Sequence, residues 1–254
     1  MNKYLIITIL LSACISKQEV KPIYDEASLK TFVLSIHTIN EQQATKQLDS
    51  ILNNASNDSL VFRKTISFLE TPFSNPNSSY RSQSLYSKLL DAEIKSRWYN
   101  GYEKQVAAGK LKLLQQNNDG NLANDFTYIT PTGDKKRMYA INAKFLLLYF
   151  NNPECNACKE MRQALAASSI ISQKIKTGEL RVLSVYTDPD EKLWLHHLNE
   201  YPPQWIQGRD DSEYLYKNKI YDLRAIPTIY LLDKDKKVLL KDCVNVGEIE
   251  RVIE

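Results

Sequence analysis

The sequence has little of three things that would settle its class at once. It contains only four cysteines in 254 residues, too few for a scaffold held together by disulfide bonds. Its net charge is only +3, so the composition carries no nucleic-acid-binding signature. The apolar run at residues 4–11 is too short to cross a bilayer as a helix. What remains is 43% hydrophobic and 25% charged, so a packed core must supply the stability, over a length that allows about two domains.

The first residues have the pattern of a targeting sequence rather than of a folded element. Lys3 precedes the apolar run, which ends in Leu-Ser-Ala-Cys at residues 11–14. This tetrapeptide resembles the cleavage motif of bacterial lipoproteins, which implies that residues 1–13 are removed and that Cys14 is lipidated. Residues 14–24 would then be a linker, and acyl chains on Cys14 would hold the protein at a membrane in the cell envelope, facing the periplasm or exposed at the surface. The alternative is an ordinary signal peptide or an uncleaved anchor with an incidental cysteine.

Residues 25–118 show helical patterns and no strand signal of comparable strength. Apolar residues repeat every three or four positions in three segments, 29–52, 59–70 and 82–98, and the last one continues to about residue 114 unless Gly101 or Gly109 breaks it. The proline-rich stretch 71–79 should end the second helix. These stripes could form a groove for a partner, but a helical core is the favoured interpretation.

Residues 119–254 have the pattern of an α/β domain, which begins after the turn cluster at 117–120. The predicted elements are a hairpin (125–130 and 137–141 around a turn at 131–134), strands at 145–150 and 180–186, a helix at 188–200 capped by Asp188 or Asp190, a loop at 201–208, a strand at 228–232 with a terminal hairpin, and a helix at 246–253. The strand, helix, strand order indicates a parallel pair in the sheet.

A C-x-x-C pair, Cys155 and Cys158, lies where the buried strand at 145–150 gives way to a helix. The residues that follow, 159–167, are strong helix formers, so Cys155 should lie at a helix N-terminus. Unpaired backbone N–H groups and the helix dipole favour a thiolate there. Cys158, one turn further on the same face, could form a disulfide with Cys155 or release a partner from it. The spacing therefore predicts a redox pair.

The order of strand, C-x-x-C helix, strand, helix, Ile-Pro-Thr at 226–228, hairpin and helix resembles the thioredoxin fold. The lead-in at 123–126, a hairpin with Gly133 and the lipoprotein signal resemble its TlpA-like membrane-anchored branch. The chain as a whole resembles bacterial lipoproteins that join a helical domain of unassigned role to such a domain. The fold class implied is an α/β thioredoxin-like fold, a central mixed β-sheet flanked by helices, preceded by an all-α N-terminal domain.

This resemblance implies a thiol-disulfide oxidoreductase without cofactor or metal. Cys155 would be the exposed nucleophile, Cys158 the resolving thiol and Pro227 a cis-proline beside them, while Ile226 would offer its backbone to a substrate. The implied partners are cysteine-containing envelope proteins as substrates, an upstream thiol-disulfide electron donor and the membrane, but no nucleic acid.

Two positions depart from the thioredoxin pattern. Tyr149 stands where a buried acid is expected, which removes a proton acceptor for Cys158. Glu154 stands where tryptophan usually precedes the first cysteine, and its charge disfavours a thiolate on Cys155. Lys159 and Arg162 act in the opposite direction.

Other interpretations of the same residues stay open. Cys243 with His196 or His197 could complete a zinc site, although structural zinc sites usually present a second close cysteine pair. Cys243 is more simply a small buried hydrophobe. Trp205 could line the substrate approach or pack in the core.

A competing function comes from a different class. The chain could be a surface-anchored binding protein whose helical domain does the work, with only a structural disulfide between the two C-x-x-C cysteines. The three histidines, including His37, show no catalytic spacing and do not favour another enzyme class.

Overall fold

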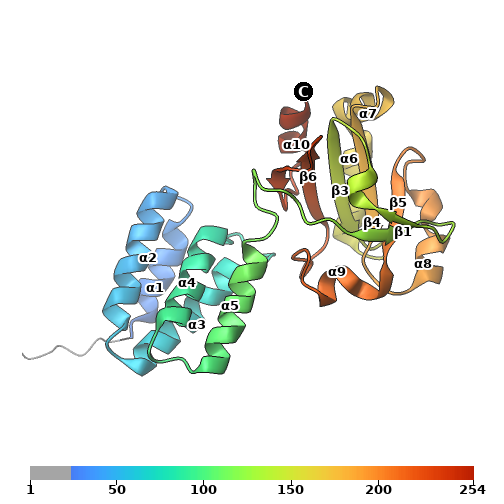
Figure 1. Cartoon of the computed structure of the whole chain (residues 1–254). Helices are drawn as coiled ribbons and strands as arrows, with labels where there is room; N and C mark the ends of the chain where they lie inside the picture. Colours follow the sequence, from blue (N-terminus) through green and yellow to red (C-terminus); the bar gives the residue numbers. More distant parts are fainter. Residues whose placement is uncertain (1–23) are drawn as a thin grey trace, which may run out of the picture.

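The computed structural model describes residues 24–254, so the expected signal peptide and Cys14 lie outside the described residues. The N-terminal half is a bundle of five helices, and an extended segment joins it to a domain built on a β-sheet (Figure 1). The helices are α1 (Glu26–Ser35), α2 (Glu41–Ala55), α3 (Ser59–Ser74), α4 (Gln83–Lys95) and α5 (Gly101–Leu114).

Asn and Asp side chains start four of these helices and divide segments that the apolar pattern alone would join. Asn40 begins α2 with a capping box, in which its side chain accepts from the Gln43 N–H and the Gln43 side chain accepts in return. Asn100 begins α5 in the same way with Glu103. The predicted long helix from residue 82 to about 114 is therefore two helices, and the break comes just before Gly101 rather than at Gly109.

The predicted end of α3 is four residues too early. Pro72 lies inside the helix, which continues to Ser74. Proline removes only one backbone donor, and Asn75 closes the helix by donating its N–H to the Thr71 carbonyl. The predicted helical core is present, because Leu48, Leu69 and Leu89 are fully buried among the apolar faces of the bundle.

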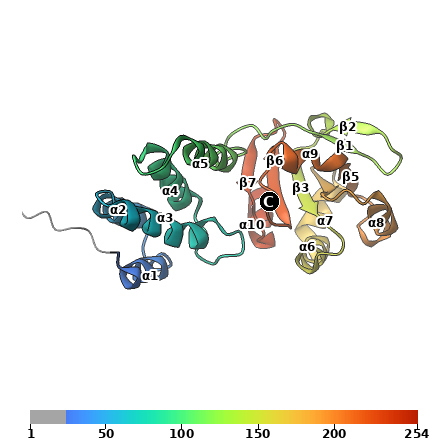
Figure 2. The same cartoon turned by 90° about the horizontal axis from the view of Figure 1, so that it is seen from below.

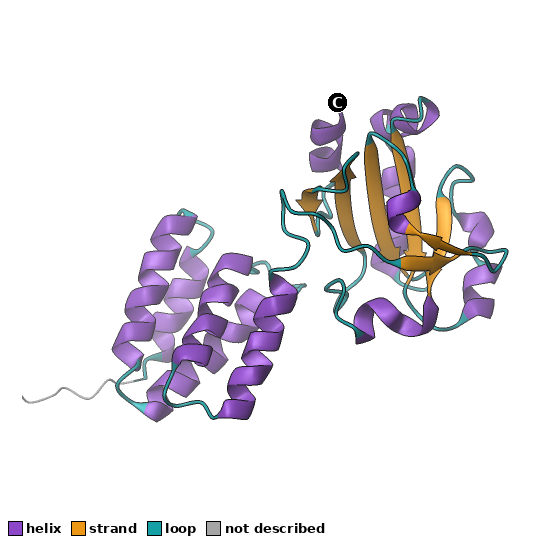
Figure 3. Cartoon of the chain, in the orientation of Figure 1, coloured by secondary structure: helices purple, strands orange, loops and turns teal. Residues whose placement is uncertain are grey.

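The C-terminal half contains one seven-stranded mixed sheet in the order β2-β1-β5-β4-β3-β6-β7 (Figure 3). The strands are β1 (Thr127–Ile129), β2 (Lys135–Arg137), β3 (Phe145–Asn151), β4 (Leu180–Tyr186), β5 (Ile206–Asp210), β6 (Thr228–Asp233) and β7 (Val238–Lys241). β3, β4 and β5 are parallel, while β6 pairs antiparallel with both β3 and β7. The apolar run that was predicted as a buried central strand is therefore paired on both sides.

A hydrophobic core lies on each face of the sheet. Helices α6 (Asn156–Ala167), α7 (Ser169–Lys176) and α10 (Val246–Ile253) cover one face, and α9 (Tyr214–Lys217) covers the other together with residues 123–141 (Figure 2). Alternate side chains of β3 enter the two cores: Leu147 and Tyr149 face α6, whereas Leu146 and Leu148 face α9. This is the period-2 alternation of a strand covered on both faces.

Three predictions for the C-terminal half are corrected by the structure. The second arm of the first hairpin is β2, residues 135–137, followed by a short 3-10 helix at 138–140 rather than a strand to residue 141. The predicted helix at 188–200 is α8 (Glu191–His196), capped by Asp190, followed by a 3-10 turn at 198–200. The predicted loop at 201–208 contains the start of β5. The strands at 180–186 and 228–232, the terminal hairpin and the helix at 246–253 are confirmed.

The two halves contact each other at the edge strand β7. The Lys241 ammonium donates to the backbone carbonyls of Leu114 (2.7 Å) and Gln116 (2.8 Å) at the end of α5. Arg81, just before α4, forms an ion pair with Asp242, just after β7. Residues 120–123 also hydrogen-bond to residues 236–238, so the connecting segment is attached to the sheet domain. Among residues 24–254, none of the helices has the length and hydropathy needed to cross a bilayer.

Candidate functional site

Cys155 begins α6, as the sequence predicts. β3 ends at Asn151, and a turn closed by the Cys155 N–H and the Asn152 carbonyl brings the chain to Cys155, whose extended backbone makes it the N-cap. The Cys155 Sγ accepts a hydrogen bond from the Cys158 N–H at 3.2 Å, so the sulfur takes the place of the side-chain oxygen of a usual N-cap residue. The Cys155 sulfur therefore lies at the N-terminus of α6, where the positive end of the helix dipole is located. The side chain is partly exposed, so a substrate can reach it.

Cys158 differs from Cys155 in its surroundings. Only 1% of Cys158 is exposed, and this burial raises the pKa of its thiol well above the usual range, with a further contribution from its hydrogen bond to Cys155. Both thiols are free in the structure. The pair therefore joins an accessible sulfur to a protected one, which is what a nucleophile and a resolving thiol require.

Tyr149 occupies the position where the thioredoxin pattern has a buried acid. Its hydroxyl donates to the Cys158 backbone carbonyl at 2.5 Å, and burial raises the pKa of Tyr149 well above its usual range. Tyr149 therefore stays neutral and fixes the first turn of α6 against β3. The Tyr149 hydroxyl thus holds the backbone of Cys158 and not its sulfur.

The loop before β6 lies against the cysteines. The Ile226–Pro227 peptide bond is cis, as the resemblance implied. The Ile226 carbonyl accepts a long hydrogen bond (3.7 Å) from the Cys155 thiol, and the Thr228 hydroxyl donates to the Ala225 carbonyl at 2.7 Å. Within residues 24–254, the Ile226 N–H has no hydrogen-bond partner. An extended peptide beside Cys155 could therefore accept a hydrogen bond from this backbone.

A buried polar network lies behind the C-x-x-C helix. Arg162, 5% exposed, donates to Glu200 at 2.6 Å, and its guanidinium stacks on the Tyr201 ring at 4.6 Å. The Tyr201 hydroxyl donates to the Asn151 side chain at 2.6 Å. The charge of Arg162, which the sequence assigns to supporting a thiolate, is thus paired with Glu200. The pKa of Glu200 is lowered, chiefly by its hydrogen bond to His197 and also by the one to Arg162.

The remaining candidate residues lie away from the exposed sulfur. Trp205 is 5% exposed and packs edge to face on Tyr149 at 6.0 Å, so it belongs to the core and does not face a substrate. Cys243 is 8% exposed, and burial raises its pKa to about 11. His197 contacts Glu200, and the residues from 24 onward contain no cluster of three or more metal-ligating side chains. The geometry of the site comes from Cys155, Cys158 and the Ile226–Pro227 loop.

Comparison with known proteins places this geometry in a family. A crystal structure of a thioredoxin-like protein from Bacteroides caccae matches with a TM-score of 0.81 and 34% sequence identity, covering 91% of this chain and 85% of the other. The chain belongs to the thioredoxin-like proteins. Since a match over 91% of the chain spans both halves, this thioredoxin-like protein shares its N-terminal helices, and their placement, with that relative.

Two other solved structures match a little over half of this chain. One is the C-terminal domain of an uncharacterized protein from Bacteroides fragilis, with 41% identity, a TM-score of 0.52, and 54% and 97% coverage of the two chains. The other is a conserved protein of unknown function from Bacteroides fragilis, with 36% identity, a TM-score of 0.51, and 53% and 98% coverage. No protein-family model and no curated protein matches. The thioredoxin-like domain thus carries the Cys155–Cys158 pair, and the match to the Bacteroides caccae protein extends over the helical half as well.

Sequence reasoning missed several residues around the site. Asn151, Tyr201 and Glu200 are joined only by the tertiary fold, and no local pattern marks them. The contribution of the helical half is also invisible in the sequence, because Pro76 and Asn77 approach the Ile226–Pro227 loop from about 150 residues away in the chain. Their only local signal is a turn-forming composition.

Proposed function

We propose that this protein is a thiol-disulfide oxidoreductase that acts on cysteine-containing proteins, as a disulfide reductase or exchange catalyst. The observation that carries the proposal is the asymmetry of the pair: Cys155 is a partly exposed helix N-cap, while Cys158 is buried one turn behind it, with its N–H 3.2 Å from the Cys155 sulfur. A structural disulfide has no need for one accessible member at a helix N-terminus.

The first step is attack by the Cys155 thiolate on one sulfur of a substrate disulfide. A Cys155–substrate disulfide forms, the substrate S–S bond breaks, and the second substrate sulfur leaves as a thiolate. The helix N-terminus and the Cys158 N–H stabilise the attacking charge. The free N–H of Ile226 positions the substrate strand by a backbone hydrogen bond, with Pro227 beside the sulfur.

The second step releases the substrate. Cys158 loses its proton and attacks the Cys155 sulfur, so that the Cys155–Cys158 disulfide forms and the Cys155–substrate S–S bond breaks. The substrate sulfur that was bound to Cys155 leaves as a thiolate and takes up a proton. Two electrons have passed from the dithiol to the substrate disulfide. The raised pKa of Cys158 makes this proton transfer the demanding part of the cycle. An upstream dithiol donor must then reduce the Cys155–Cys158 bond.

The proposed place of work is the cell envelope. The Leu-Ser-Ala-Cys sequence at residues 11–14 supports a lipid on Cys14, which would hold the domains at a membrane outside the cytoplasm. Disulfide exchange with envelope proteins is consistent with the redox conditions there.

The test is reduction of insulin disulfides by the full chain in the presence of an excess of dithiol. Cys155→Ser should abolish turnover. Cys158→Ala, mixed with insulin after the dithiol has been removed, should retain a mixed disulfide on Cys155 that can be seen by mass. Cys243→Ser serves as the matched control and should behave as wild type. Turnover that survives loss of both C-x-x-C cysteines would overturn the proposal.

A redox titration separates catalysis from a structural bond. A catalytic Cys155–Cys158 disulfide should have a potential between about −120 and −270 mV, whereas a structural one resists reduction below about −300 mV. A value in the lower range would instead favour a scaffold role for the domain.

A further inference from the structure

A pocket of about 160 Å³ lies directly beside the C-x-x-C pair, and both halves of the protein line it. Ala157, between the two cysteines, and the Ile226–Pro227 loop form its thioredoxin-like side. Pro76 and Asn77 form the opposite side, from the loop that joins α3 to α4, residues 75–82. The helical half therefore reaches the immediate surroundings of the proposed nucleophile.

The loop at 75–82 is held in shape by its own hydrogen bonds. The Asn77 N–H donates to the Asn75 side chain at 2.9 Å, and the N–H groups of Ser78 and Arg81 donate to loop carbonyls at 3.0 and 3.1 Å. The Ser82 N–H closes the loop onto the Phe73 carbonyl at 3.2 Å. A wall that is ordered before the substrate arrives costs less entropy on binding.

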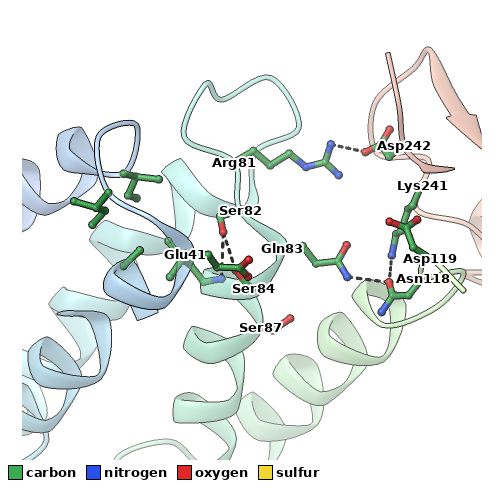
Figure 4. A pocket seen from close by; sticks show the side chains of 14 residues that line it. Glu41, Arg81, Ser82, Gln83, Ser84, Ser87, Asn118, Asp119, Lys241 and Asp242 are labelled. Atoms are coloured by element: carbon green, nitrogen blue, oxygen red, sulfur yellow. Dashed lines mark hydrogen bonds and ion pairs between the residues drawn. The ribbon is translucent and has the colours of Figure 1, made fainter. Parts of the chain in front are cut away.

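One ion pair ties this loop to the sheet domain. The Arg81 guanidinium reaches across to the Asp242 carboxylate, as Figure 4 shows, and the pair stands between the small pocket and a larger cavity of about 770 Å³ between the two halves. On the larger side, Gln83 donates to Asn118 at 2.8 Å and Lys241 donates to the same oxygen at 2.7 Å. These contacts fix the distance between the loop and the Ile226–Pro227 segment.

The chemistry of the lining defines the occupant. Carbon atoms, among them those of Pro76, Ala157 and Pro227, form about half of the lining, and polar atoms form the other half. Val244, an exposed apolar residue, also lines the space. The charged groups of the lining already have partners: Arg81 pairs with Asp242, and Asp222 is held by a two-point contact with Arg224 at 2.7 and 2.8 Å. A pocket with its charges paired attracts an apolar side chain more than a charged one.

We propose that the loop at residues 75–82 is the second wall of the substrate site, and that this pocket receives one apolar side chain adjacent to the substrate cysteine. The inference rests on the proposed function and adds to it a preference for substrates with an apolar residue next to the reacting cysteine. The volume is close to that of an engineered protein cavity of about 150 Å³ that binds benzene, so it is large enough for a side chain of the size of valine or leucine. The helical half then selects substrates, and the sheet domain carries the chemistry.

The test compares two peptides that differ only in the residue next to their single cysteine, leucine in one and aspartate in the other. Each cysteine is linked by a disulfide to 2-nitro-5-thiobenzoate, whose release is followed by absorbance. Attack by Cys155 on the peptide sulfur expels the chromophore as a thiolate, and Cys158 then releases the peptide. The protein is reduced beforehand and freed of reductant, so each molecule reacts once. The readout is the ratio of the second-order rate constants for the two peptides, so that a general loss of activity cancels.

Wild-type protein should prefer the leucine peptide by at least about tenfold, because the aspartate carboxylate would enter beside Asp222 and Asp242 with no free cationic partner. Asn77→Trp fills the pocket, and Arg81→Ala removes the ion pair that holds the loop at residues 75–82 to the sheet domain. Each variant should bring the ratio of the rate constants for the two peptides close to one. Lys88→Ala is the matched control: it breaks an ion pair with Asp49 inside the helical half and should leave the ratio unchanged.

Two outcomes would overturn the inference: equal rates for the two peptides in the wild type, or a preference that survives Asn77→Trp. Reduction of 2-hydroxyethyl disulfide, which has no side chain to fill the pocket, separates this failure from that of the proposed function. If wild type reduces this small disulfide but shows no peptide preference, only the pocket assignment falls. If it does not reduce the small disulfide, the proposed function falls as well.

Discussion

Glu93 is a buried carboxylate in the helical half whose ionisation should be visible in the stability of the protein. It is 8% exposed in α4, and its Oε1 has no hydrogen-bond partner among the described residues. Loss of hydration, followed by the nearby charge of Glu70, raises its pKa from 4.5 to about 7, against the opposing effect of Lys110. The folded state therefore holds this proton over a pH range in which the unfolded state has lost it.

The sign follows from linkage. Below pH 4.5 both states are protonated and folding binds no proton, whereas between pH 4.5 and 7 the folded state binds more protons, so the free energy of unfolding falls as pH rises. With a pKa of about 7 in the folded state and 4.5 in the unfolded state, Glu93 should make the protein about 2.5 kcal/mol less stable at pH 8 than at pH 5. Above pH 8 the loss is complete.

The assay is urea unfolding of wild type and of Glu93→Gln at both pH values, followed by helical circular dichroism. Glutamine resembles the protonated acid, so the stability advantage of the variant over wild type should grow by about 2.5 kcal/mol between pH 5 and pH 8. Comparison of the two proteins removes the contribution of every other titrating group. A stability difference that stays the same at both pH values would refute the reasoning.

Three further predictions concern the contact between the two halves, the packing of β5 and the lipid on Cys14. Lys241→Met removes the hydrogen bonds from the ammonium group to the end of α5 and to Asn118, which should lower the free energy of unfolding by about 2 kcal/mol. Calorimetry should then show two unfolding transitions in place of one, and a single transition in the variant would contradict this prediction. Gly208→Ala would place a Cβ 2.6 Å from the ring of Tyr128, so urea unfolding should show a loss of about 1–3 kcal/mol, and an unchanged midpoint would be evidence against that contact. Cys14→Ser should move the expressed protein from the detergent phase to the aqueous phase of a Triton X-114 partition, unless Cys14 carries no lipid.

The sequence predicts those parts of the fold that local chemistry controls. The apolar runs at 145–150 and 180–186 are buried on both faces except at Phe145 and Arg181. The position of Cys155 follows from a strand, a turn and a set of helix formers. The place of Pro227 immediately before β6 is likewise predicted by local chemistry, because proline is tolerated at the start of a strand. These segments agree with the structure because propensity and tertiary context favour the same state.

Other parts depend on partners that are distant in the chain. β5 (Ile206–Asp210) reads as polar, with Gln207 and Arg209, and becomes a strand only because β4 and β1 pair with it on its two sides. The helix at Pro72 continues because its apolar face packs in the bundle, with Phe73 1% exposed. The approach of the helical half to the Ile226–Pro227 loop depends on side-chain contacts at β7, which no pattern in the sequence encodes.

The most direct test of the central claim is the alkylation of the reduced, folded protein by iodoacetamide at pH 7, read by peptide mass spectrometry. Cys155, partly exposed at the start of α6, should be modified first, and Cys158, 1% exposed, should react at least about tenfold more slowly because it must wait for local opening. Rapid modification of Cys155 alone is the predicted result. A Cys155 that stays unmodified, or a Cys158 that reacts as fast, would contradict the assignment of nucleophile and resolving thiol.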